Sequence, residues 1–306
     1  MPKPSKETTA KVRQVSRVLN RVHSYLDAQC FHPRRGSYLD ATVLTLLSKS
    51  LTLARSTVCL VQGGFDEEAF GVSRSLLELA MTLRYITNGR NPEARAKRFV
   101  DFVAKIKMDW GRKAIEFFSF PASAVRKDMA TYKKFQSMER KFPKLGWQQA
   151  SKKHAKGIWT MAMEPDRYEK VPVLDKNGKP VLNKRGKAKL KPLNWALDYR
   201  VMYFWESQYV HVTIDSLDNH AAFPERPFVV YTHGSRPSRR KTDFGDLALF
   251  NTITNMHKIL LAGFRGLGHS YPEELSKPVE ALMKSLVETR KSLTSKPANI
   301  WGTQPI

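Results

Sequence analysis

At 306 residues and 42% hydrophobic composition, the chain holds enough apolar residues for a packed core, and this excludes general disorder. Its 52 Lys and Arg residues against 28 Asp and Glu residues give a formal net charge of +24. Such an excess attracts polyanions, and nucleic acid is the usual one because each neutralised phosphate releases counterions. The alternatives are a basic protein kept soluble by its charge and a chain balanced by an acidic protein partner.

Apolar residues recur at spacings of three and four through most of the chain, which is typical of amphipathic helices. Gly63–Gly64 and Asn88–Gly89 are expected to end helices, and Asn91–Pro92 is expected to begin one. The expected helices cover residues 12–26, 39–62, 66–88, 92–110, 121–135, 195–217, 246–264 and 272–293. We predict a mainly α fold, a helical bundle formed as one domain over residues 1–306.

Two basic segments interrupt these helices. Residues 141–192 are rich in Lys and Arg, with Gly and Pro throughout, and Asn177–Gly178 lies there between two short β-prone runs. Because that dipeptide favours the left-handed geometry of a tight turn, we predict an inserted basic β-hairpin, with a solvated loop as the alternative. Residues 220–244 form the second segment, which we predict to be an irregular basic loop.

Cysteine content and hydropathy indicate the cellular compartment in which the protein is expected. The two cysteines, Cys30 and Cys59, form no C-x-x-C pair, and we expect two reduced, buried thiols rather than a disulfide framework or a zinc site. We therefore expect no metal and no cofactor. Residues 1–6 lack the apolar core of a signal peptide, and no stretch approaches the roughly 20 apolar residues that span a bilayer. These features predict a soluble, cytoplasmic protein.

Two predicted helices carry polar side chains at positions where apolar ones are expected. Arg74 and Glu78 are four residues apart and share one helix face. Tyr203, Ser207 and His211 are aligned at i, i+4 and i+8. An arginine, a carboxylate and a histidine on facing helices could hold a phosphate and move a proton. The structural alternatives are an intrahelical ion pair for Arg74 and Glu78 and a hydrogen-bonded core histidine for His211.

These two motifs resemble those of a known protein family. The Arg-Ser-Leu-Leu-Glu segment at residues 74–78, followed by Tyr203, Ser207 and Val210–His211, resembles an uncharacterised all-helical bacterial family over about Leu39 to Leu217. In that family an R-x-x-x-E helix and a Y-x-x-x-S-x-x-V-H helix recur. The family is in turn similar in outline to HEPN proteins, helical bundles that often act as RNA-cleaving toxins in bacterial conflict and phage defence.

The resemblance implies a metal-independent ribonuclease. Arg74 and Glu78 would position the phosphate or orient the base. His211 would be the acid/base, supported by Ser207 and Tyr203. HEPN ribonucleases typically place their Arg and His a short interval apart on one segment, so here Arg74 and His211 would replace that motif from separate helices.

The basic segments supply the predicted nucleic-acid contacts. Lysine and arginine would contact phosphates, and the nearby Trp147, Trp159, Trp195 and Tyr231 could stack on unpaired bases. The alternative is solvated loops whose aromatic residues pack on the helical body. The predicted contacts are Lys152, Lys153, Lys156, Lys184, Arg185, Lys187, Lys189, Arg236, Arg239, Arg240 and Lys241.

The leading hypothesis is therefore a HEPN-like toxin or effector of bacterial antiphage defence that acts on nucleic acid, RNA favoured over DNA, as a metal-independent ribonuclease. The first alternative is a non-catalytic RNA- or DNA-binding subunit of a larger complex, in which Arg74, Glu78 and His211 form a buried polar network. The second is a partner of an acidic antitoxin protein. None of these hypotheses requires a membrane.

Overall fold

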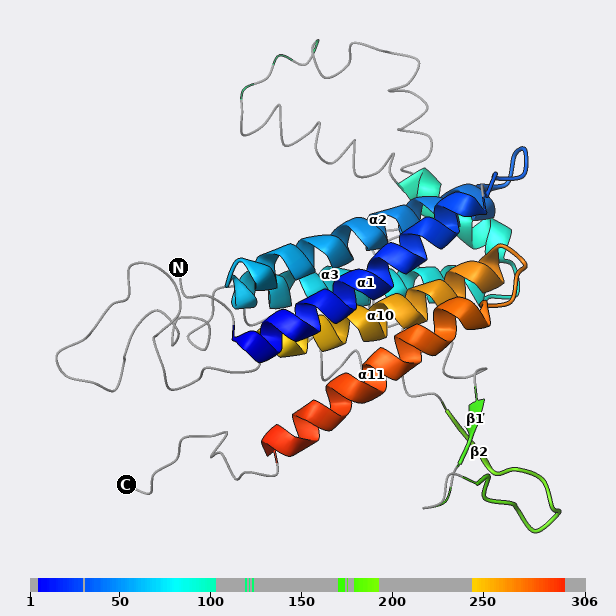
Figure 1. Cartoon of the computed structure of the whole chain (residues 1–306). Coiled ribbons are helices and arrows are strands. Elements are labelled where there is room, and N and C mark those ends of the chain that lie inside the picture. Colours follow the sequence, from blue (N-terminus) through cyan, green and yellow to red (C-terminus); the bar gives the residue numbers. More distant parts are fainter. Residues whose placement is uncertain are drawn as a thin grey trace. The chain divides into compact units, whose positions relative to one another are not determined.

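The computed structural model describes residues 5–29, 31–102, 119, 121, 123, 170–173, 175, 179–192 and 244–294. These residues are mainly α-helical, which confirms the predicted fold class (Figure 1). The labelled elements are α1 (Lys6–Ala28), α2 (Tyr38–Gln62), α3 (Asp66–Thr87), β1 (Lys170–Pro172), β2 (Leu190–Pro192), α10 (Phe244–Gly266) and α11 (Glu273–Thr294). Residues 92–102 are also helical. The helices predicted over residues 121–135 and 195–217 fall largely or wholly outside the described residues.

Contacts between residues divide the chain into two compact units, each made of several segments. The first unit comprises Met1–Phe31, Leu46–Ala80 and Arg200–Ile306, and the second comprises His32–Thr45 and Met81–Tyr199. Both α2 and α3 contribute residues to each unit. The single domain expected over the whole chain stays a prediction, as does the irregular basic loop, which lies outside the described residues.

Helix α10 lies in the core of the first unit. Its buried residues, between Gly245 and Gly266, are spread around the helix circumference rather than along one stripe, as expected of a fully enclosed helix. The helix packs against α1 and α11 (Figure 1). Gly263 permits close approach to α2, because a Cβ there would lie 2.8 Å from Cδ2 of Leu47. Tyr25 of α1 and Phe264 meet edge to face, with ring centroids 6.0 Å apart.

The apolar stripe that predicted α1 is its buried face, from Val12 to Val22. Lys11 is buried beside that stripe and needs carboxylate partners. Its Nζ lies 2.5 Å from Oδ2 of Asp246 and 2.9 Å from Oε1 of Glu7. A second carboxylate lies near Asp246: burial, and then the negative charge of Asp246, raise the pKa of Asp66. Asp66 begins α3 and Asp246 lies in the first turn of α10, so the starts of these two helices lie close together in the first unit.

Helix α2 corrects two expectations from the sequence. It is long and apolar enough to cross a membrane by length and composition, with a mean hydropathy of 1.3, whereas no such stretch was expected. A core helix of a soluble protein passes the same test, and α2 buries Leu47, Ala54 and Val61. Cys59 is exposed rather than buried, because it falls outside the i, i+3, i+4 series of those buried positions. Cys30 lies outside the described residues.

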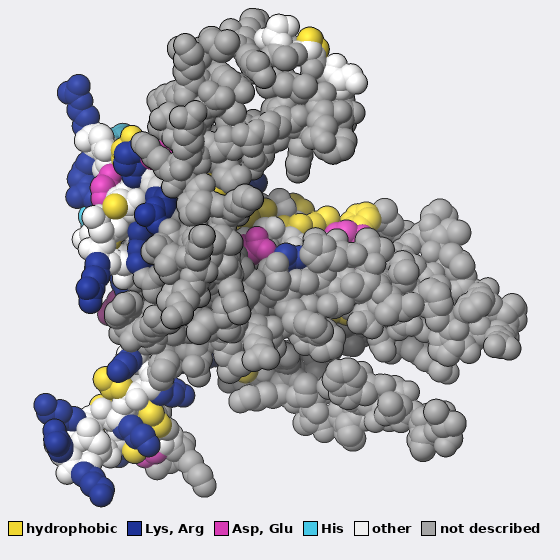
Figure 2. Space-filling model, turned by 180° about the vertical axis from the view of Figure 1, so that it is seen from behind, with side chains coloured by type: hydrophobic (Ala, Val, Ile, Leu, Met, Phe, Trp, Pro, Cys, Tyr) yellow, Lys and Arg dark blue, Asp and Glu magenta, His cyan; other side chains and the backbone are white. Residues whose placement is uncertain are grey.

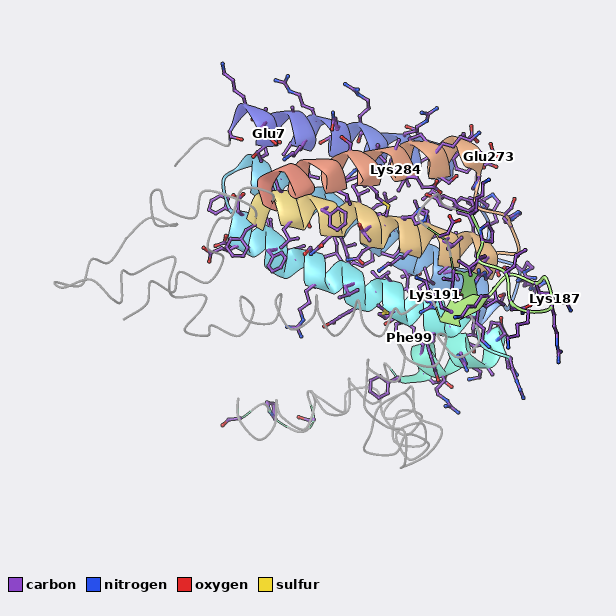
Figure 3. All side chains as sticks on the ribbon, turned by 90° about the horizontal axis from the view of Figure 1, so that it is seen from below. Glu7, Phe99, Lys187, Lys191, Glu273 and Lys284 are labelled. Atoms are coloured by element: carbon purple, nitrogen blue, oxygen red, sulfur yellow. The ribbon has the colours of Figure 1, made fainter. Side chains whose placement is uncertain are left out.

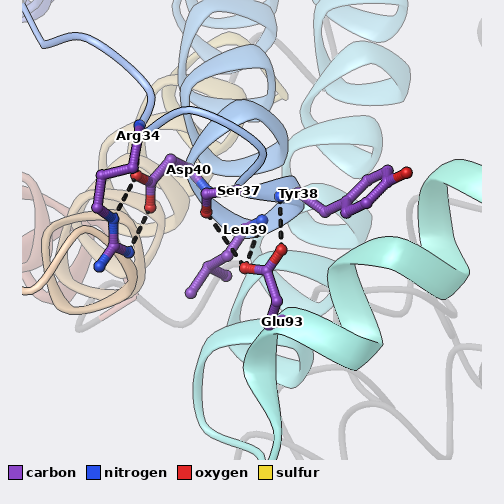
Figure 4. A network of polar contacts seen from close by, with 6 residues as sticks. All are labelled: Arg34, Ser37, Tyr38, Leu39, Asp40 and Glu93. Atoms are coloured by element: carbon purple, nitrogen blue, oxygen red, sulfur yellow. Dashed lines mark hydrogen bonds and ion pairs between the residues drawn. The ribbon is translucent and has the colours of Figure 1, made fainter.

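A carboxylate from the second unit holds the start of α2 (Figure 4). Oε1 of Glu93 accepts the N–H of Tyr38 at 2.6 Å, and Oε2 accepts the N–H of Leu39 at 3.1 Å and the hydroxyl of Ser37 at 3.2 Å. The first N–H groups of a helix have no intrahelical partner, so they require such an acceptor. This arrangement, the Glu93 clamp, ties residues 92–102 to the start of α2.

Asp40, in the first turn of α2, holds the loop that precedes the helix (Figure 4). Its buried carboxylate accepts the backbone N–H of Arg34 at 2.9 Å and both Nε and Nη2 of the Arg34 guanidinium at 2.7 Å. The guanidinium hydrogen bonds are the main cause that lowers the pKa of Asp40 from 3.8 to about 2. The loop and the helix are therefore joined by a charged, bidentate contact.

We expect Asp40→Asn to lower the free energy of unfolding by about 1 kcal/mol near neutral pH, because the partner Arg34 is largely exposed and the pair is screened. The folded-state pKa of Asp40 lies below its ordinary value of 3.8. The contribution is therefore complete above about pH 4 and is lost as the pH falls towards 2. Urea unfolding followed by circular dichroism, at neutral pH and at several acidic values, measures this dependence.

The control is Asp27→Asn, which removes an exposed contact with His23 that is an ion pair only when the histidine is protonated, and it should cost no more than about 0.5 kcal/mol. A loss for Asp40→Asn that stays constant from neutral pH down to about pH 2 would contradict the assignment of this stability to the ionised carboxylate.

Candidate nucleic-acid interface

Of the predicted catalytic set, the described residues are Arg74 and Glu78, both on α3. Nε of Arg74 lies 3.2 Å from Oε1 of Glu78, and the side chains are 12% and 39% exposed. The two residues therefore form the intrahelical ion pair that their spacing predicts. Tyr203, Ser207 and His211 lie outside the described residues, so their convergence on Arg74 stays a prediction.

The environment of Arg74 limits what this pair can do. Leu76 and Leu77, which follow Arg74 in α3, are almost fully buried, and the Arg74 side chain itself is 12% exposed. A guanidinium carries five N–H donors in a fixed plane, and Arg74 has a further interaction besides the one with Glu78. Glu78, the more exposed partner, orients that plane. The pair is chemically suited to hold an anion at the helix surface, and a proton-transfer step would need a further group.

The strands β1 and β2 pair antiparallel, with Lys170 opposite Pro192 and Pro172 opposite Leu190. Between them, three short segments exchange backbone hydrogen bonds in a ring. Val173 N–H donates to the carbonyl of Lys189 at 2.8 Å, Lys189 N–H donates to Val181 at 2.7 Å, and Val181 N–H donates to Val173 at 2.7 Å. Residues 170–192 are called the basic hairpin below. The turn predicted at Asn177–Gly178 lies outside the described residues.

The described turn of the basic hairpin is built around Asn183. Its Oδ1 accepts the N–H groups of Arg185 at 2.9 Å and Lys187 at 3.1 Å, and its carbonyl accepts the N–H of Gly186 at 2.9 Å. Gly186 has a φ of 70°, in the left-handed region that favours glycine. Asn183 and Gly186 are thus the local signal for this turn, and the sequence interpretation placed its emphasis on Asn177–Gly178 instead.

This turn presents the predicted contact residues to solvent. Lys184, Arg185, Lys187 and Lys189 are all exposed. Figure 2 shows Lys and Arg side chains projecting from the basic hairpin, with hydrophobic side chains between them, and Figure 3 shows Lys187 at its far end and Lys191 on β2. Further exposed lysines that were not among the predicted contacts are Lys170, Lys179 and Lys191.

The charge of the basic hairpin is weakly compensated. Among its described residues the carboxylate is Asp175, whose Oδ1 accepts the N–H of Lys179 at 2.9 Å. The other predicted contacts lie outside the described residues: Lys152, Lys153, Lys156, Arg236, Arg239, Arg240 and Lys241. Within the part of the chain that the structure describes, no group of three or more His, Cys, Asp or Glu side chains could hold a metal ion.

Comparison with known proteins gives one match. The chain fits the model of DUF5677, a family of unknown function, over residues 40–226. No curated protein and no solved structure matches it significantly. The matched segment contains Arg74, Glu78, His211 and the whole basic hairpin, and it covers more than half of the chain. This mainly helical chain therefore belongs to the DUF5677 family of unknown function.

Proposed function

We propose that this chain binds nucleic acid, with RNA favoured over DNA, through the basic hairpin, and that it works in the cytoplasm. The observation that carries the proposal is the cluster of exposed Lys and Arg side chains on an ordered turn with one described carboxylate nearby. Clustered cations on an ordered backbone contact phosphates with little loss of backbone entropy. The formal net charge of +24 adds long-range attraction.

The strand geometry supports contact with a phosphate backbone. Side chains alternate along a strand, so Lys189 and Lys191, which flank Leu190, point to one face about 7 Å apart. That interval resembles the distance between successive phosphates along an extended strand. The opposite face carries Leu182 and Leu190, which are 61% and 53% exposed. An apolar face of this kind suits unstacked bases, which are available in single-stranded RNA.

Neutralising Lys184, Arg185, Lys187 and Lys189 together to Ala should weaken binding to single-stranded RNA at least tenfold at physiological salt. The slope of log K against log salt should fall by about 3, because four phosphate contacts are lost. Fluorescence anisotropy with a labelled oligonucleotide, over a series of salt concentrations, measures both quantities.

The matched control neutralises four exposed cations that lie on helices α2, α10 and α11, outside the basic hairpin: Lys49, Arg265, Lys277 and Lys284. It changes the net charge by the same amount and should leave the slope nearly unchanged. Equal losses in both variants would show that net charge alone governs binding, and would remove the basic hairpin from the proposal.

A second candidate is favoured by the Arg74–Glu78 pair. A mostly buried guanidinium held beside a carboxylate resembles a phosphate-positioning group, and the predicted His211 would supply the acid/base. In this proposal the chain is a HEPN-like, metal-independent ribonuclease, a toxin or effector of bacterial antiphage defence. The non-catalytic alternative is an RNA- or DNA-binding subunit of a larger complex.

Cleavage of total bacterial RNA in the presence of EDTA separates these candidates. A ribonuclease should lose at least a hundredfold in rate on His211→Ala or Arg74→Ala, because each removes a group from the transition state. His32→Ala, at an exposed position, is the control and should retain full rate. Binding of RNA without cleavage by any variant would support the non-catalytic subunit, and absence of binding would favour an acidic protein partner such as an antitoxin.

A further inference from the structure

An open cleft of about 590 Å³ lies in the second unit, between the loop that precedes α2 and the loop that precedes residues 92–102. The first loop contributes Arg34, Arg35 and Ser37, the second contributes Arg90, and Glu93 lies in the helix that follows the second loop. The Glu93 clamp joins that helix to the start of α2, so the cleft has walls fixed by direct hydrogen bonds (Figure 4). It is called the arginine cleft below.

The two carboxylates near the arginine cleft are already engaged. Glu93 accepts two backbone N–H groups at the positive end of α2, and Asp40 accepts the guanidinium of Arg34. Arg35 and Arg90 are exposed, and within the described residues neither has a hydrogen-bond or ion-pair partner. The cleft therefore keeps two uncompensated guanidinium groups after its internal pairs are formed.

Both guanidinium groups extend from ordered backbone. The N–H of Ser37 donates to the carbonyl of Arg34 at 3.0 Å, and Gly36 has a φ of 79°, so Arg35 occupies the corner of a closed turn. Arg90 directly precedes Asn91, whose Oδ1 caps the next helix by accepting the N–H of Ala94 at 3.0 Å. Holding two like charges near one cleft costs free energy, and a bound anion offsets that cost.

We propose that the arginine cleft binds a phosphate group, with Arg35 and Arg90 as its direct contacts. A guanidinium donates two parallel N–H groups to phosphate oxygens. The phosphate comes either from the end of an RNA strand or from within its backbone, and this part of the inference rests on the proposed function. The site itself requires only a phosphate.

The first test uses inorganic pyrophosphate as the probe and isothermal titration calorimetry as the readout. Arg35→Ala/Arg90→Ala should lose at least tenfold in affinity. Lys49→Ala/Lys284→Ala, which removes two exposed cations elsewhere, should bind like the wild type. Because Arg35 and Arg90 have no partner within the described residues, the melting temperature of the double variant should stay close to that of the wild type.

The second test compares a single-stranded RNA that ends in a 5′-phosphate with the same RNA ending in a 5′-hydroxyl. A terminal-phosphate site predicts that the wild type prefers the phosphorylated end about tenfold and that Arg35→Ala/Arg90→Ala abolishes the preference. A backbone site predicts equal loss for both RNAs and a salt slope lower by about 1.5. Pyrophosphate binding without RNA binding would refute the proposed function and keep the site. Equal pyrophosphate affinity in the two double variants would overturn the site.

Discussion

Carboxylates are scarce in this chain, with 28 against 52 basic side chains, and their placement organises the rest of the structure. Three described carboxylates in buried or helix-starting positions each stabilise a local arrangement. Asp246 neutralises the buried Lys11, Asp40 fixes the loop before α2, and Glu93 caps the start of α2. Other cations, such as Arg35 and Arg90, face solvent and have no partner within the described residues. The described cations therefore include paired, structural groups and uncompensated ones.

Two of the exposed arginines lie on ordered turns of the same kind. In the basic hairpin Arg185 directly precedes Gly186, and in the arginine cleft Arg35 directly precedes Gly36. Both glycines have left-handed backbone, with φ of 70° and 79°. A left-handed residue reverses the chain within a few residues, so the side chain before it lies at the corner of the turn and points outward. The same local device thus presents arginine in two separate parts of the second unit.

Local signals in the sequence predicted most of the described helices, because helix ends depend on neighbouring residues. Asn88–Gly89 and Asn91–Pro92 mark the end of α3 and the next helix start to within a residue or so. The Glu93 clamp could not be predicted, because it joins positions 54 and 55 residues apart and periodicity carries no such information. The exposure of Cys59 could be deduced only once the buried face of α2 was known.

The candidate site could be predicted from the sequence only in part. The four-residue spacing of Arg74 and Glu78 predicted their ion pair, whereas an isolated loop arginine such as Arg90 belongs to no sequence pattern.

The ring of backbone hydrogen bonds through Val173, Val181 and Lys189 has an evolutionary consequence. A segment that satisfies its own backbone polar groups makes few demands on the residues that flank it. Its length and charge can therefore change without altering the residues that form the described helices.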